Sequence, residues 1–133
     1  MFHKNIINDL ERAKKYFEDI STYQISPYSL NGMIKKNSDA FKLIDVRDYE
    51  DYIDGHIEYA EYIPFNKIEE NFDMLDKTKP TILYCYNSSC QRAVKAALKL
   101  VDKGYPSAIL EGGMELWEDF DFEIVRNSSP ENL

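Results

Sequence analysis

Residues 81–104 read Thr-Ile-Leu-Tyr-Cys-Tyr-Asn-Ser-Ser-Cys-Gln-Arg-Ala-Val-Lys-Ala-Ala-Leu-Lys-Leu-Val-Asp-Lys-Gly, and they decide the fold class. Their first five residues form the most apolar and most strand-like run in the chain. Apolar residues then recur at helical spacing until Gly104, a residue type that commonly ends helices. They are Ala93, Ala96, Ala97, Leu100 and Val101. The polar turn at 86–91 therefore joins a buried strand to a helix.

Similar units lie on both sides of this stretch. Residues 42–47, Lys-Leu-Ile-Asp-Val-Arg, predict a buried strand, and 107–110 predict another. A short strand is expected around Tyr62 and Ile63. Helices are expected from Ser26-Pro27, over 48–55, from Asn66 to before Lys79-Pro80, over 90–103 and over 114–120. Alternating strands and helices indicate an α/β fold with a mostly parallel sheet covered on both faces.

The two ends of the chain differ in character from this middle part. Residues 1–24 carry one apolar stripe, which predicts an amphipathic helix packed on the domain; it covers too few heptads for a coiled-coil arm. The stripe consists of Ile6, Leu10, Ala13, Phe17 and Ile20. The domain itself is placed at 25–126. Residues 127–133 are polar with one proline, so a flexible tail is expected there.

Size and charge exclude several classes of protein. The chain has 133 residues, which favours one domain, and a net charge of −8, which disfavours nucleic acid and anionic membrane surfaces as partners. Apolar runs are far too short to span a bilayer. Residues 1–20 lack the pattern of a secretory signal. We therefore expect a cytoplasmic protein.

Two cysteines, Cys85 and Cys90, are the candidates for chemistry. Cys85 ends the predicted central strand, where α/β proteins place their sites, and the following helix N-terminus lowers the pKa of a nearby thiol. Cys85 is thus predicted to be an ionised nucleophile; the alternative is a buried packing residue. The two histidines, His3 and His56, match no metal-ligand spacing, so no metal is expected.

Three segments in this order resemble the signatures of rhodanese-like sulfurtransferase domains. Asp45-Val46-Arg47 is followed by Gly55-His56-Ile57, Ala60 and Ile63-Pro64; residues 81–85 precede the turn and helix; and Glu111-Gly112-Gly113 precedes Trp117. The resemblance implies a three-layer sandwich around a mostly parallel sheet. It also implies a single-domain sulfurtransferase that needs no cofactor and carries sulfane sulfur as a cysteine persulfide.

Carried over by position, the resemblance assigns the site. Cys85 matches the persulfide-forming cysteine, and Arg47 matches a substrate-contacting arginine, while Asp45 and His56 match scaffold positions. The loop whose amides surround the sulfur corresponds to Tyr86, Asn87, Ser88, Ser89, Cys90 and Gln91. The implied partners are a small sulfur donor, either thiosulfate or a persulfide, and a thiol acceptor; a protein persulfide is a further candidate.

The loop departs from the family pattern because it holds neither glycine nor a cation. Arg92 is the first cation after Cys85 and is a second candidate for substrate binding, with a surface cation as the alternative. The weaker positive charge predicts poor turnover of thiosulfate and favours another persulfide as donor. The spacing from Cys85 to Arg92 is one residue longer than in cysteine phosphatases, which leaves phosphate chemistry a minor option.

Two other functions remain open at this point. In a thiol-redox protein, Cys90 would attack an oxidised Cys85 and close a disulfide; a small residue facing the core explains Cys90 equally well. In a non-catalytic binding module, tyrosines around the Gly55-His56-Ile57 turn would form a partner surface. These are Tyr49, Tyr52, Tyr59 and Tyr62.

Overall fold

A computed structural model describes residues 1–127, and a five-stranded parallel sheet runs through its centre. The strands lie in the order β1 (Gln24–Ile25), β6 (Ser107–Leu110), β5 (Thr81–Tyr84), β2 (Lys42–Asp45) and β4 (Glu61–Tyr62). A separate antiparallel pair joins β3 (His56–Ile57) to β7 (Ile124–Val125). The predicted α/β class with a mostly parallel sheet is confirmed.

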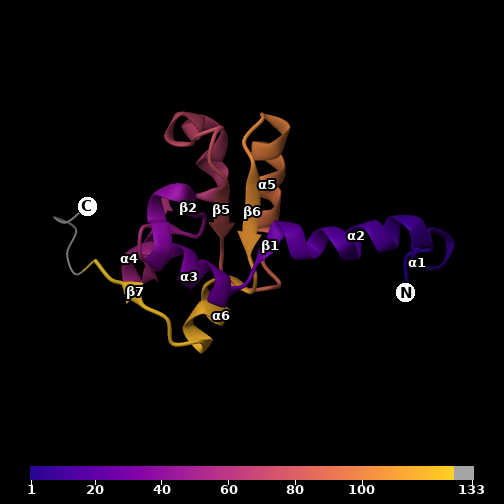
Figure 1. The fold of residues 1–133 in the computed structure, drawn as a ribbon, viewed down its shortest axis with the longest axis horizontal. Coiled ribbons are helices and arrows are strands. Elements are labelled where there is room, and N and C mark those ends of the chain that lie inside the picture. The colour runs from indigo at the N-terminus through magenta and orange to yellow at the C-terminus, as the bar shows by residue number, and fades with distance from the viewer. Residues whose placement is uncertain (128–133) are drawn as a thin grey trace.

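Helices cover both faces of the sheet, which produces three layers (Figure 1). Side chains alternate along β5, so that Ile82 and Tyr84 belong to one core cluster while Leu83 and Cys85 belong to the other. The first cluster lies under α3 (Pro27–Asn37) and α6 (Gly113–Asp119), and the second under η2 (Phe65–Met74) and α5 (Arg92–Asp102). Cys85 therefore faces the α5 side. The remaining short helices are η1 (Ser38–Ala40) and α4 (Tyr49–Asp54).

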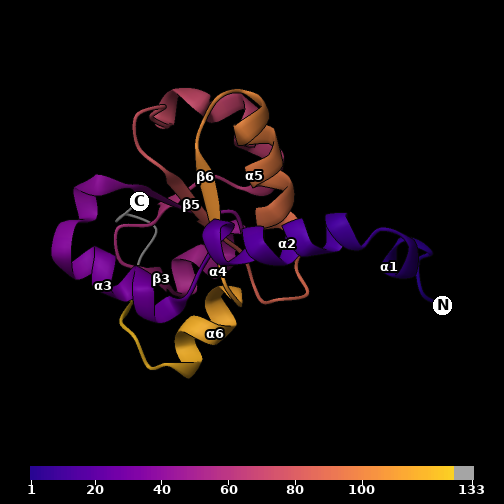
Figure 2. The same cartoon turned by 45° about the vertical axis from the view of Figure 1, so that its right-hand side comes forward.

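The N-terminal helices differ from the predicted packing. The chain forms α1 (Asn5–Asn8) and α2 (Leu10–Tyr23), yet neither helix has a buried residue, and Leu10 and Phe17 are 69% and 67% exposed. Figures 1 and 2 show α2 extending away from the sheet. Because α2 leads directly into the two-residue edge strand β1, it meets the domain mainly at β1 and β6. Most of the apolar stripe lies in solvent.

Other differences are local. Residues 65–74 form 3-10 turns interrupted at Asn71, where an α-helix was expected. The strands β1, β3 and β7 have two residues each and were not predicted, because so short a segment shows no periodicity. Of the expected tail, 128–133 lie outside the described residues, and the Asn127 amide donates to the Ile53 carbonyl at 3.0 Å. Among the described residues, no helix has both the length and the apolar content needed to cross a bilayer.

The start of α6 is pressed against the turn that follows β5. The amides of Met114 and Glu115 donate to the carbonyls of Cys85 and Tyr86, each at 2.9 Å. Gly113 has a φ of 59°, and a Cβ built on it would lie 2.6 Å from the Cys85 carbonyl oxygen. Since neither this conformation nor this distance suits a side chain, glycine is required here.

We therefore expect Gly113→Ala to push the turn away from α6. The free energy of unfolding should fall by about 1–3 kcal/mol, the typical cost of a strained backbone position, as measured by urea denaturation. Gly32→Ala is the matched control, because Gly32 lies inside α3 with no atom within 4 Å of its built Cβ. That variant should gain roughly 0.5–1 kcal/mol. Equal stability of the two variants would contradict the assigned close approach.

Candidate active site

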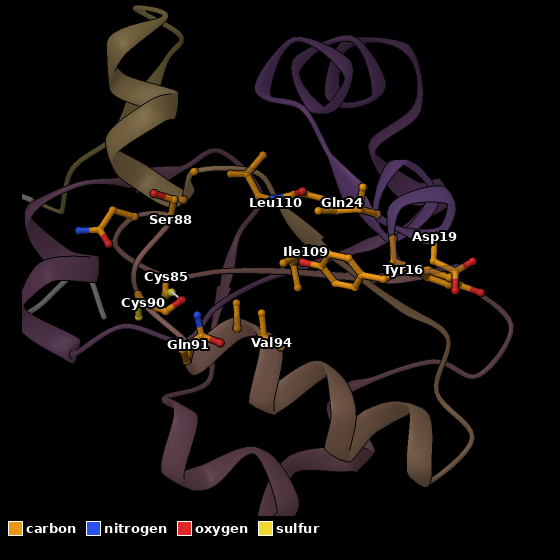
Figure 3. A pocket seen from close by; sticks show the side chains of 16 residues that line it. Tyr16, Asp19, Gln24, Cys85, Ser88, Cys90, Gln91, Val94, Ile109 and Leu110 are labelled. Carbon is orange, nitrogen blue, oxygen red and sulfur yellow. Dashed lines mark hydrogen bonds between the residues drawn. The ribbon is translucent and has the colours of Figure 1, made fainter. Parts of the chain in front are cut away.

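A pocket of about 520 Å³ opens at the carboxyl ends of β5 and β6, between the turn after β5 and the N-terminal helix α2 (Figure 3). Its volume falls within the range of roughly 300–1,000 Å³ that is typical of sites for small organic ligands. The turn contributes Cys85, Asn87, Ser88, Cys90 and Gln91 to the lining; α2 and β6 contribute Tyr16, Asp19, Ile20, Tyr23, Ile109 and Leu110.

Both cysteines lie in this pocket as free thiols. Cys85 directly follows β5 and is 3% exposed, whereas Cys90 is half-buried. The Cys85 thiol contacts the Cys90 carbonyl oxygen at 3.6 Å and also forms a hydrogen bond with the Cys90 thiol. Figure 3 shows the two side chains next to each other at one end of the pocket. They form one thiol pair.

The turn directs one of its own amides, that of Tyr86, toward this pair, while the amides of Ser89 and Cys90 bond to Asn87. Asn87 closes it by accepting hydrogen bonds from the Cys90 amide at 3.1 Å and, through its side chain, from the Ser89 amide at 3.0 Å. The Cys85 carbonyl points at α6, and in a trans peptide the next amide points the opposite way. The Tyr86 amide accordingly faces both sulfurs, and the first amides of α5 join it, Ala93 toward Cys85 and Arg92 toward Cys90.

Burial decides the acidity of Cys85. The pKa of Cys85 is raised to about 11: removal from water is the largest cause, the hydrogen bond with Cys90 adds to the rise, and the amides of Ala93 and Tyr86 offset only part of it. The pKa of Cys85 as a free thiol thus shifts in the direction opposite to the one that the helix N-terminus was expected to cause. The amides are present as expected, but desolvation outweighs them.

Cys90 shifts in the opposite direction. Burial acts against its ionisation, but the hydrogen bond from Cys85 and the amides of Arg92 and Tyr86 outweigh burial and lower the pKa of Cys90. Cys90 is also the more exposed of the two thiols. The first negative charge of the pair therefore settles on Cys90, stabilised by the neutral Cys85 thiol.

Arg47 does not reach the pocket, in contrast to the role that its position suggested. Its side chain is buried, with Nε and one terminal nitrogen bound to the Asp45 carboxylate at 2.8–3.1 Å. The same terminal nitrogen donates to the Gly55 carbonyl at 2.6 Å. Through these contacts the guanidinium links Asp45 to the turn before β3, so Arg47 stabilises the fold at this point.

Arg92 is also directed away from the pocket. Its guanidinium forms an ion pair with Asp48 at 3.0 Å and lies 5.5 Å from the centre of the Tyr86 ring. Tyr86 points the same way, because its hydroxyl bonds to the Asp51 carboxylate. Neither Tyr86 nor Ser89 lines the pocket. Among the lining residues, the only charged side chain is Asp19, an acid.

The other positions expected to be structural fit that role. Asp45 is fully buried against Arg47, and buried His56 stacks on Tyr52 with ring centres 3.9 Å apart. Tyr49 and Tyr52 pack against Tyr62 rather than facing the pocket. Within residues 1–127 no cluster of three or more His, Cys, Asp or Glu side chains has the arrangement of a metal site.

Sequence reasoning missed the wall that α2 contributes. Tyr16, Asp19, Ile20 and Tyr23 repeat at three- and four-residue steps, which places them on one helix face toward the pocket. This spacing is visible in the sequence and could have indicated a helix face that lines a pocket. It was not recognised because the apolar stripe was assigned to packing on the domain core.

The two cysteines should react differently with an alkylating agent as pH changes. Because its pKa lies near 11, Cys85 should gain reactivity about tenfold per pH unit up to that value, whereas Cys90 should level off at lower pH. Peptide mass spectrometry after short exposure to iodoacetamide at pH 7 should find Cys90 modified first. Faster modification of Cys85 at pH 7 would contradict the assigned order.

Comparison with known proteins agrees with this geometry. Residues 26–120 match the rhodanese-like domain family. The thiosulfate sulfurtransferase GlpE of Coxiella burnetii is 33% identical over 96 residues, covering 71% of this chain and 86% of that protein. The putative sulfurtransferase YtwF of Bacillus subtilis is 33% identical over 95 residues, covering 71% and 89%. The crystal structure of the BH2092 protein from Bacillus halodurans superposes with a TM-score of 0.80 at 33% identity, covering 90% of this chain and 88% of that chain. The chain therefore belongs to the rhodanese-like domain family.

Proposed function

We propose that this protein is a sulfurtransferase in which Cys85 accepts a sulfane sulfur as a persulfide and passes it to a thiol acceptor. The observation that carries the proposal is the position of Cys85 at the end of β5, at one end of the pocket, with the amides of Tyr86 and Ala93 facing its sulfur. Membership of the rhodanese-like family supports it. The pocket gives a donor access to a sulfur that is otherwise buried.

The thiol pair supplies the nucleophile. Cys90 carries the first negative charge and accepts a hydrogen bond from Cys85, so the Cys85 proton can pass to Cys90 as Cys85 attacks. With a donor R–S–SH, the Cys85 sulfur bonds to the outer sulfur of the donor, and the donor leaves as the thiolate R–S⁻. An acceptor thiolate later takes the outer sulfur from Cys85 and restores the Cys85 thiolate. Amides that face the sulfur stabilise the negative charge in both steps.

The pocket favours an uncharged organic persulfide over thiosulfate. Arg47 and Arg92 are bound to Asp45 and Asp48, and the lining carries Asp19 as its single charged group. No lining cation would offset the negative charge of a dianion such as thiosulfate, and the carboxylate of Asp19 would repel it. The apolar walls formed by Ile20, Ile109 and Leu110 instead suit the carbon skeleton of a small thiol. GlpE relatives are named for thiosulfate, and we infer a different preferred donor here.

Persulfide formation should be visible directly on the protein. Brief exposure to a small organic persulfide, followed at once by alkylation, should add one sulfur to wild type at Cys85 and none to Cys85→Ser, as read by peptide mass spectrometry. Turnover with an excess thiol acceptor should fall on the order of 10³-fold or more in Cys85→Ser, because the nucleophile is lost. Cys90→Ser lacks the thiol that takes the Cys85 proton, so it should gain the sulfur more slowly than wild type, and the added sulfur should still be on Cys85. Sulfur found on Cys90 alone would overturn the proposal.

Asp19 gives a test of the donor preference. Wild type should have a lower kcat/KM for thiosulfate than for a neutral organic persulfide. Asp19→Asn should raise the thiosulfate value roughly two- to fivefold by removing like charge, with little change for the neutral donor. Glu18→Gln is the matched control, because Glu18 is exposed on the same helix and does not line the pocket. Added salt should shrink the difference. Equal responses of both donors would contradict the electrostatic argument.

A further inference from the structure

Cys90 has no assigned part in sulfur transfer beyond holding a proton, yet the fold places it beside the sulfur that is to be loaded. The turn closed by Asn87 brings residue 90 close to residue 85. The Cys85 thiol therefore contacts both the carbonyl and the thiol of Cys90. Both residues line the same pocket. A thiol held this close competes with any acceptor from solution, because intramolecular attack has a high effective concentration.

The two thiols are not equivalent, and the difference sets the direction of attack. Cys85 is nearly inaccessible, while Cys90 is half-buried. Burial opposes ionisation of Cys90, but the amides of Arg92 and Tyr86 stabilise its thiolate, and these backbone groups remain after Cys85 has lost its proton and gained the outer sulfur. Once Cys85 carries an outer sulfur, Cys90 is the nucleophile already in place.

We propose that Cys90 resolves the persulfide on Cys85 and releases its outer sulfur as hydrogen sulfide ion. This inference rests on the proposed persulfide at Cys85. After Cys90 gives its proton to solvent, its thiolate attacks the inner sulfur of Cys85–S–SH. A Cys85–Cys90 disulfide forms, the bond to the outer sulfur breaks, and HS⁻ leaves with the electron pair.

The balance of this step defines a second activity. The sulfane sulfur is reduced to sulfide while the two cysteine sulfurs are oxidised to the disulfide. An external dithiol then donates two electrons and two protons to restore both thiols. Over one cycle, a sulfane sulfur and a dithiol become sulfide and a cyclic disulfide. The protein thus acts as a dithiol-dependent persulfide reductase whenever no acceptor thiol intercepts the outer sulfur.

The pocket accommodates this step without help from elsewhere in the chain. The amides of Tyr86 and Ala93 face the Cys85 sulfur, which is bonded to the outer sulfur on which negative charge develops as HS⁻ departs. The open side of the pocket gives the ion a route to solvent. A disulfide in this turn would occupy the nucleophile, so the protein would stay inactive in transfer until reduced.

A single-turnover experiment tests the inference. Wild type, Cys90→Ser and Cys85→Ser are loaded with a small organic persulfide, freed of the donor and incubated without any thiol. Wild type should release one equivalent of sulfide and become two hydrogens lighter than its dithiol form. Cys90→Ser should keep the added sulfur at least about tenfold longer, because the positioned nucleophile is gone. Dithiothreitol should return wild type to its starting mass.

Peptide analysis identifies the bond. Trypsin cuts after Lys77 and Arg92, which leaves both cysteines in one peptide, so the disulfide appears as resistance to alkylation that dithiothreitol removes. Cys85→Ser should show neither added sulfur nor protection. Cys90→Ala, with a thermal melt on each variant, guards against an effect of misfolding, and it should behave as Cys90→Ser does.

The outcomes separate the two proposals. Equal persulfide lifetimes in wild type and in both Cys90 variants would overturn the resolving role of Cys90 and leave the sulfurtransferase proposal standing. A wild type that neither gains sulfur on Cys85 nor releases sulfide on exposure to the organic persulfide would overturn the persulfide on Cys85 and this inference together. Sulfide release from wild type without loss of free thiols would also overturn the inference.

Discussion

The contact between α6 and the turn after β5 is the constraint on which the site depends. Two α6 amides hold the carbonyls of Cys85 and Tyr86, and the planar trans peptide after Cys85 then directs the Tyr86 amide to the opposite side. That side is the pocket, where the Tyr86 amide meets both sulfurs. Gly113 permits the approach, since any Cβ there would strike the Cys85 carbonyl. The donors that stabilise a sulfur anion are thus set by a contact on the far side of the turn.

The chemistry of Cys85 follows from a competition between burial and these donors. Burial, with the hydrogen bond to Cys90, outweighs the amides and raises the pKa of Cys85, so the free thiol stays protonated at neutral pH. Cys90 favours ionisation of Cys85 during a reaction, because its thiolate lies in hydrogen-bonding contact with Cys85 and can take the Cys85 proton directly. The negative charge then moves from one sulfur to the other, and no second charge forms in the pocket. A pocket whose lining lacks cations needs such a device, since both nearby arginines are held by aspartates. The second cysteine thus supplies locally what a cationic side chain would otherwise provide.

The sequence was sufficient for the parts of the fold that show strong periodicity. The strands around Leu43, Ile82 and Ala108 and the helix after Cys90 were predictable, as was the place of Cys85 at a strand end. The expected contact of Arg47 with substrate came from its position in a motif, which does not reveal what the side chain binds. In the structure its guanidinium binds the buried carboxylate of Asp45. The pKa of Cys85 was misjudged for a similar reason, since depth of burial depends on packing from distant parts of the chain. The stripe on α2 was identified, but its exposure depends on how β1 enters the sheet.

The pocket is lined by two parts of the chain, one inside the segment that matches the family and one before it. Its reactive end lies within 26–120, the segment matched by the rhodanese-like family, whereas Tyr16, Asp19, Ile20 and Tyr23 come from the helix before it. The segment matched by the family therefore positions Cys85 and the amides that face it, while the preceding helix α2 determines the charge and shape of the opposite wall of the pocket. The BH2092 structure superposes over 90% of this chain, more than the matched segment alone, so its likeness extends beyond that segment. Because none of its residues is buried, α2 can accept side-chain substitutions with little effect on the packing of the sheet and of the turn after β5.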